Sequence, residues 1–169
     1  MAFANLYKSI YADLYKMAYY IIGNRELAED IVSDTVIDAY RSISSLKDCD
    51  KFESWILKIL TNKCKRAMRN KYSKFSIFNP NARNPEDYHL QSKDRISMQE
   101  ELTDITRALA QLSYEDKVII SLCIIEGYKS TEVAKILSMK PTTVRSRLNR
   151  GLSKMKKYLE VEANEKQLS

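Results

Sequence analysis

Apolar residues recur every three or four positions along most of this chain, and this spacing constrains the fold more than any other feature. It places the apolar side chains on one face of an α-helix. No long run alternates apolar and polar residues between turn signals, and the 169 residues include only three glycines and three prolines. Strands are therefore not expected, and we predict an all-α fold. The first apolar stripe comprises Phe3, Leu6, Ile10, Leu14, Met17 and Ile21.

Short polar and glycine signals divide the first half into helices. Gly23 is expected to end the first helix, and Asn24 is expected to cap a second one that ends near Ser44. Asp50 and Glu53 resemble a capping box that opens a third helix. The inner face of the second helix is predicted to hold Leu27, Ile31, Thr35 and Ala39. That of the third is predicted to hold Phe52, Trp55, Ile56, Ile59 and Leu60.

The helical period is lost after Phe75, where asparagines and two prolines accumulate. Residues that precede proline avoid helical geometry, so we interpret this segment as a linker. The period returns from Ile96, and Ser113 is expected to cap a later helix. We predict two small helical domains, a three-helix N-terminal unit and a C-terminal helix-turn-helix domain. Their bounds are 1–74 and 96–169, joined by a flexible linker at 75–95.

The stretch PTTVRSRLNRG, from Pro141 to Gly151, is the predicted second helix of the helix-turn-helix. A short helix and a turn at Ser138 to Lys140 precede it, which is the spacing of this motif. Its opposite side carries hydroxyls, an amide and guanidinium groups, the donors that phosphates and base edges accept in a major groove. Its apolar side is predicted to hold Val144, Leu148, Leu152, Met155 and Leu159.

Basic residues are concentrated in two segments of a chain whose net charge is +6. Residues 51–74 contain eight basic residues and one acid, and residues 129–157 contain nine and one. A basic helix can simply be a solvated surface. Here the helix-turn-helix spacing coincides with an acid-free stretch from Lys140 to Tyr158, so we favour contact with DNA.

Several classes of function are not expected. The longest uncharged runs have eight residues, against about 20 for a membrane-spanning helix, and no secretory signal opens the chain. Cys49, Cys64 and Cys123 fit neither a disulfide framework nor a zinc pattern, which favours a cytoplasmic location. His89 is the sole histidine, and we find no phosphate loop or nucleophile constellation. We expect no enzyme activity, cofactor or metal.

Three segments, one in the C-terminal half and two in the N-terminal half, resemble the extracytoplasmic-function sigma factors of bacterial RNA polymerase. In the C-terminal half, YKSTEVAKILSMKPTTVRSRLNRGLSKMK is similar to the helix-turn-helix of that family. In the N-terminal half, NRELAEDIVSDTVIDAYRS and FESWILKILTNKCKR resemble its Ala-Glu-Asp helix and its Phe-x-x-Trp helix. Thr142 replaces the usual glycine of the motif, and Pro141 precedes it.

This resemblance implies an alternative sigma factor that binds core polymerase, recognises minus-35 DNA and melts minus-10 DNA. It implies that the loop from Ser44 to Lys51 reads a minus-10 base. Polymerase binding, at the clamp of the largest subunit, would involve Glu29, Asp30, Val32, Asp34 and Val36. Minus-10 DNA binding would involve Asn62, Lys63, Lys65, Arg66 and Arg69. Minus-35 DNA binding would involve Thr142, Thr143, Arg145, Ser146, Arg147, Asn149 and Arg150.

The implied partners are core RNA polymerase, double-stranded and melted promoter DNA, and an anti-sigma factor, without membrane insertion. One alternative is a free-standing transcriptional regulator whose N-terminal domain dimerises or senses a ligand. Another is an interaction protein that uses its acidic helix as a docking peptide. A dimeric regulator would need an exposed apolar seam, whereas a sigma factor needs an acidic docking helix beside a basic DNA-binding helix.

Overall fold

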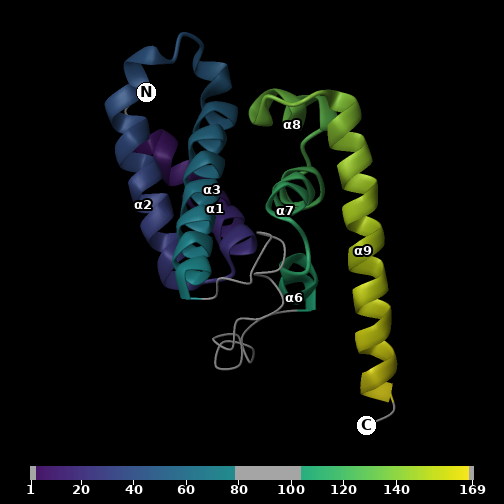
Figure 1. The fold of residues 1–169 in the computed structure, drawn as a ribbon. Helices are drawn as coiled ribbons and strands as arrows, with labels where there is room; N and C mark the ends of the chain where they lie inside the picture. Colours follow the sequence, from purple (N-terminus) through teal and green to yellow (C-terminus); the bar gives the residue numbers. More distant parts are fainter. Residues whose placement is uncertain (1–2, 79–103, 168–169) are drawn as a thin grey trace.

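The computed structural model describes the backbone of residues 3–78 and 104–167, and the side chains of residues 8–70 and 104–165. All regular elements in these ranges are helical, which confirms the predicted class. They form two blocks (Figure 1). The first contains α1 (Phe3–Ile22), α2 (Arg25–Ser42) and α3 (Phe52–Phe78). The second contains α6 (Asp104–Ala110), α7 (Tyr114–Ile120), α8 (Ser130–Leu137) and α9 (Pro141–Gln167).

Most predicted helix ends are confirmed. Gly23 follows α1 with φ +70°, a conformation that glycine adopts without strain. Asn24 caps α2, since its Oδ1 accepts the amide N–H of Leu27 at 2.8 Å. Ser113 caps α7 by accepting the amide N–H of Asp116 at 3.3 Å. These polar side chains satisfy donors that a helix N-terminus leaves unpaired.

The predicted start of α3 is wrong in detail. A short 3₁₀ turn, Cys49–Lys51, precedes the helix, and Asp48 caps that turn by accepting the N–H of Asp50. Glu53 does not complete a capping box, because its carboxylate instead accepts the hydroxyl of Tyr128 from the second block. α3 also continues to Phe78, into the segment that we predicted to be a linker.

The core of the first block lies between its antiparallel helices. Leu14, Met17 and Ile21 of α1 are buried, as the apolar spacing predicts, and Ile56 and Leu60 of α3 lie opposite them. Trp55 is partly buried and packs on this core beside Phe52, with 6.0 Å between ring centroids. The tryptophan is therefore a packing residue, as predicted.

The two blocks pack directly against each other. α1 contacts α6 and α7, and α3 contacts α8. Val118, Ile119 and Leu122 of the second block join the same apolar cluster as α1. A π-helical turn, Ser121–Ile125, continues α7 and also contacts α1. The hydrophobic contacts of the blocks are thus continuous in this structure, although each block corresponds to one predicted domain.

The helix-turn-helix is formed as predicted. α8 ends at Leu137, Ser138 has the left-handed φ of 55°, and α9 begins at Pro141. Proline fits this first helical position because it needs no amide donor there. α9 runs along the outer side of the second block and extends well beyond α8 (Figure 1).

Candidate nucleic-acid and polymerase interfaces

The N-terminal half of α9 presents a polar face, here called the recognition surface. Its members are exposed, and they include most of the predicted minus-35 residues: Thr142, Thr143, Arg145, Ser146, Asn149 and Arg150. Val144, within the same turns, is fully buried and anchors the helix. The recognition surface therefore offers guanidinium, amide and hydroxyl groups to an external acceptor.

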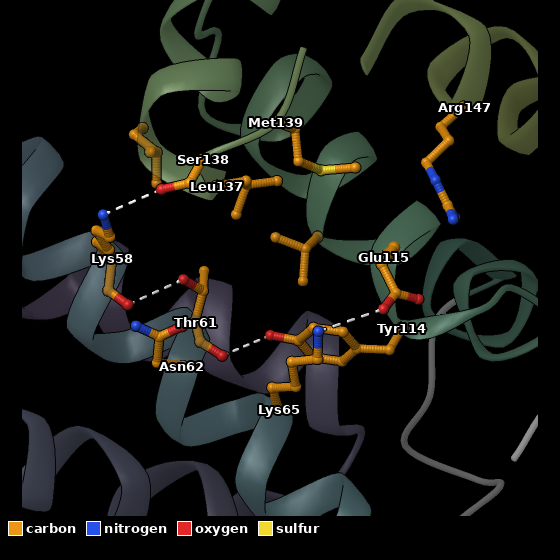
Figure 2. A pocket seen from close by; sticks show the side chains of 12 residues that line it. Lys58, Thr61, Asn62, Lys65, Tyr114, Glu115, Leu137, Ser138, Met139 and Arg147 are labelled. Atoms are coloured by element: carbon orange, nitrogen blue, oxygen red, sulfur yellow. Dashed lines mark hydrogen bonds and ion pairs between the residues drawn. The ribbon is translucent and has the colours of Figure 1, made fainter. Parts of the chain in front are cut away.

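Arg147 differs from the other predicted minus-35 residues because it faces the protein. Its Nη1 donates to Oδ1 of Asp116 at 3.0 Å, and the side chain of Asp116 is only 4% exposed. In Figure 2 the Arg147 side chain extends from α9 towards α7. Sequence reasoning missed Asp116, although an acid in the first turn of a predicted helix is a recognisable signal.

The buried face of α9 also departs from prediction. Leu152, expected on the apolar side, is 37% exposed, whereas its neighbour Gly151 is buried. An added Cβ at Gly151 would lie 2.7 Å from Cδ1 of Ile120. The absence of a side chain lets α9 approach α7 here, so the contact face includes a glycine and an arginine that an apolar pattern does not identify.

Exposed cations and an amide of α3 form a second face, here called the basic surface: Asn62, Lys65, Arg66 and Arg69. Lys63, also predicted for minus-10 DNA, is half-buried, and its Nζ lies 2.7 Å from Oδ2 of Asp38 on α2. This hydrogen bond lowers the pKa of Asp38. Lys63 therefore also links α2 to α3.

The outer side of α2 carries the predicted polymerase-binding acids. Glu29, Asp30 and Asp34 are exposed, and Val36 is half-buried. Val32 is fully buried, so its assignment to a docking surface is corrected to a core role. We define the acidic surface as Glu29, Asp30, Asp34, Val36, Ile37 and Tyr40.

Ile37 and Tyr40 lie on the acidic surface but were not among the residues predicted from the sequence. They are 47% and 65% exposed, and they place apolar side chains beside the acids of α2. The available signal was their position, because both lie off the inner stripe of Ile31, Thr35 and Ala39.

Polar contacts join α3 to the second block (Figure 2). The Tyr114 hydroxyl donates to the Thr61 carbonyl at 2.5 Å, Lys58 Nζ lies 3.2 Å from Ser138 Oγ, and Lys65 Nζ lies 3.5 Å from Glu115. Burial raises the pKa of Tyr114, so this hydroxyl remains a donor. Elsewhere Lys16 pairs with Glu126 at 3.1 Å, and that hydrogen bond raises the pKa of Lys16.

A pocket of about 430 Å³ lies between the blocks at this point. Its wall on α3 includes Lys58, Asn62 and Lys65, and its opposite wall includes Tyr114, Met139 and Arg147. Predicted minus-10 and minus-35 residues thus line one pocket. Among the described residues, no group of three or more His, Cys, Asp or Glu could hold a metal ion. No described helix is long and apolar enough to cross a bilayer.

Models of two sigma-70 regions match this chain, region 2 at residues 6–73 and region 4 at residues 102–155. RNA polymerase sigma factor SigV of Bacillus subtilis is 30% identical over 144 residues, which cover 85% of this chain and 82% of SigV. ECF RNA polymerase sigma factor SigE of Mycolicibacterium smegmatis is 30% identical over 163 residues, or 90% of this chain and 59% of SigE. This chain belongs to the extracytoplasmic-function group of the sigma-70 family.

Two solved sigma-factor structures have a similar fold. The first is RpoE of Bartonella quintana in complex with the anti-sigma factor NepR, with TM-score 0.75 and 23% identity. The match covers 94% of this chain and 97% of RpoE. The second is CnrH in complex with the cytosolic domain of CnrY, with TM-score 0.67 and 20% identity, covering 94% and 88%. Both support the fold.

Membership of this family confirms the predicted general function. The protein is an alternative sigma factor that directs promoter-specific transcription initiation, and such factors are not enzymes. It binds core RNA polymerase and promoter DNA. The free-standing regulator and the docking-peptide protein are thereby set aside.

Proposed function

We propose that this sigma factor divides its work among the three surfaces defined above. The acidic surface of α2 docks on the clamp of the largest polymerase subunit. The basic surface of α3, with the adjoining loop at 44–51, binds and melts the minus-10 element. The recognition surface of α9 reads the minus-35 element. An anti-sigma factor is a further proposed partner, and the cytoplasm is the proposed location.

The observation that carries this proposal is the opposite charge of two adjacent helices in one small unit. Exposed acids lie on α2 and exposed cations lie on α3, and α2 and α3 pack together. One block can therefore hold an anionic polymer with α3 while α2 contacts a different partner. The cations and the amide on α3 suit phosphates and unstacked bases.

The two promoter elements are too far apart for the arrangement seen here. Their names place them roughly 25 base pairs apart, or about 85 Å along B-form DNA. The blocks contact each other directly, and Asn62 and Lys65 of the basic surface line one pocket with Arg147 of α9. We therefore propose that the blocks separate when the protein engages polymerase and promoter. Melting uses the free energy of binding exposed bases and phosphates and needs no nucleotide hydrolysis.

Run-off transcription with core polymerase and genomic DNA fragments tests this proposal. Specific start sites are expected only when the protein is added. DNA binding without polymerase, combined with no new start sites, would contradict the proposal. Substituting Lys65 and Arg69 with Ala should reduce open-complex formation on these fragments, measured by permanganate reactivity. Substituting Lys154 and Lys156, on the later part of α9, supplies a control with the same loss of charge.

A further inference from the structure

Arg147 lies within the recognition helix but contacts α7. We propose that Arg147 is a positioning residue that fixes the rotation of α9 through Asp116, and that it does not contact DNA. This inference rests on the proposed reading of minus-35 DNA by α9. It assigns readout to Arg145 and Asn149, and it gives Asp116, an acidic residue, a part in DNA specificity.

The burial of Asp116 is the first observation behind this proposal. Its side chain is 4% exposed, while that of Arg147 is 29% exposed, and one charge-assisted hydrogen bond of 3.0 Å joins them. A buried carboxylate that loses its cation is strongly destabilised. Moving the Arg147 guanidinium onto a phosphate would leave Asp116 in that condition, so the pair should persist when DNA binds.

The packing around Asp116 is the second observation. Gly151 lies one turn beyond Arg147, and a Cβ added there would lie 3.6 Å from Cβ of Asp116. Val144, almost one turn before Arg147, is fully buried. One face of α9 is thus held against the second block by Val144, Arg147 and Gly151.

Helix geometry connects this fastened face to the DNA. At 100° per residue, Arg145 and Asn149 each project about 160° away from Arg147. When Arg147 is held against Asp116, those two side chains must point outward. Rotation of α9 about its axis would misdirect both together, and small errors of direction are costly for paired hydrogen bonds to base edges.

The test compares Arg147→Ala with Arg145→Ala in the full-length protein. The probe is the duplex that the wild-type chain enriches most strongly from a randomised pool, with a scrambled duplex as reference. Affinity is measured by fluorescence anisotropy over a range of salt concentrations. The slope of log affinity against log salt is negative, and loss of one phosphate contact reduces its magnitude by about 0.9. We expect Arg147→Ala to weaken binding to the selected duplex about tenfold with an unchanged slope.

Asp116→Asn provides a second test, because it removes a negative charge whereas Arg147→Ala removes a positive one. It removes a negative charge from a DNA-binding domain, which by charge alone should tighten binding. The positioning role predicts the reverse, a loss of about tenfold for the selected duplex and little change for the scrambled one. Tighter binding to both duplexes would overturn the proposal.

A double variant keeps the proposal testable if the single variants fold poorly. Asp116→Asn with Arg147→Gln replaces the ion pair by two amides that can hydrogen-bond to each other. Selectivity for the enriched duplex should return towards the wild-type value, because the link between α9 and α7 is restored without either charge. If Arg147 binds phosphate, the double variant will bind as weakly as Arg147→Gln alone, with a smaller salt slope.

The outcomes also separate this inference from the proposed function. If the wild type selects no duplex, or if Arg145→Ala leaves selection intact, the assignment of α9 to DNA reading fails. If Arg145→Ala impairs selection but Arg147→Ala lowers the salt slope by about one contact, only the positioning role fails.

Discussion

The cations of α3 and those of α9 are held in different ways. On α3, Lys63 is bonded to Asp38, and Lys65 is paired with Glu115 from the other block. On α9, Arg145 and Arg150 are exposed, and no ion pair joins either to an acid among the described residues. Of the three arginines between Pro141 and Gly151, only Arg147 is paired with an acid of the second block.

This difference indicates that the two proposed DNA surfaces are available under different conditions. The recognition surface of α9 can meet DNA in the arrangement seen here, since its side chains already point to solvent. One of the four members of the basic surface of α3, Lys65, is paired with Glu115 of the second block and becomes free when Glu115 leaves it. We therefore expect separation of the blocks to free Lys65 for the proposed contact with minus-10 DNA, whereas the proposed minus-35 contacts of α9 need no such separation.

The largest expected effect concerns the acidic surface, because we propose that it docks the protein on polymerase for initiation at every promoter. Substituting Asp30 and Asp34 with Lys should weaken association with core polymerase by about 100-fold or more, because like charges at an interface cost several kcal/mol. Co-purification with core polymerase measures the loss, and initiation from every promoter should fall together.

A matched control uses Glu160→Lys with Glu165→Lys on the distant part of α9. This pair changes the net charge equally but lies outside the acidic surface, so polymerase association should persist. Unchanged co-purification of the Asp30 and Asp34 variant would remove α2 from the docking surface.

The next effect distinguishes α9 from α3 directly. Arg145→Ala should cost about 1–3 kcal/mol at promoters that depend on a minus-35 element, because it removes a proposed contact to a base edge. Promoters whose use depends mainly on minus-10 contacts should be affected less. Transcription from paired templates, identical except for a scrambled minus-35 element, measures this selectivity. Equal weakening on both templates would indicate a general defect and not a loss of readout.

A smaller effect concerns the contact between the blocks. Tyr114→Phe keeps the ring but removes the hydroxyl that donates to the Thr61 carbonyl. We expect the free energy of unfolding to fall by about 1 kcal/mol, the usual net value of one hydrogen bond. Chemical denaturation measures this change, and faster hydrogen exchange along α3 should accompany it.

Tyr158→Phe is a suitable comparison, because the Tyr158 hydroxyl bonds to Glu162 within α9. It should leave hydrogen exchange along α3 unchanged. Equal exchange in wild type and Tyr114→Phe would mean that the hydroxyl contributes little to holding the blocks together.

The smallest effect is the pH dependence of the Asp38–Lys63 pair. The hydrogen bond from Lys63 lowers the pKa of Asp38 below its unfolded value of about 3.9. The pair therefore contributes stability above that pH, and the contribution is lost as the pH falls through the lowered pKa. It is modest, because the side chain of Asp38 is 49% exposed.

Asp38→Asn should reduce stability slightly at pH 7 and flatten its decline below about pH 4. Thermal unfolding midpoints across this range measure both changes, and Lys63→Met should give the same flattening. Parallel declines in wild type and variants would show that the pair does not govern acid sensitivity.

Sequence reasoning succeeded where a local rule dominates. Asn24, Ser113 and Pro141 act at helix starts through their own side chains or ring, so neighbouring residues suffice to predict them. Sequence reasoning failed where a distant residue binds the side chain that was expected to act locally. Glu53 was expected to cap α3, yet its carboxylate instead accepts a hydrogen bond from the hydroxyl of Tyr128, which lies far along the chain.

The same reason explains the errors at the candidate sites. Val32 and Ile37 are both β-branched aliphatic residues of α2, but packing against α1 and α3 buries only the first. Arg147 and Arg145 are identical in type, and the position of Asp116 on another helix gives only Arg147 an inward ion pair. Residue type and spacing identify the helix that carries a site, whereas the packing of neighbouring helices determines which side chains remain available.

The cysteines offer a practical consequence. Cys64 is fully buried, and desolvation raises the pKa of its thiol to about 12, so it should resist alkylation in the folded protein. Cys49 is exposed in the segment proposed to read a base of the minus-10 element. Once half-buried Cys123 is replaced by serine, a maleimide fluorophore attached to Cys49 would report strand opening in real time at the native position.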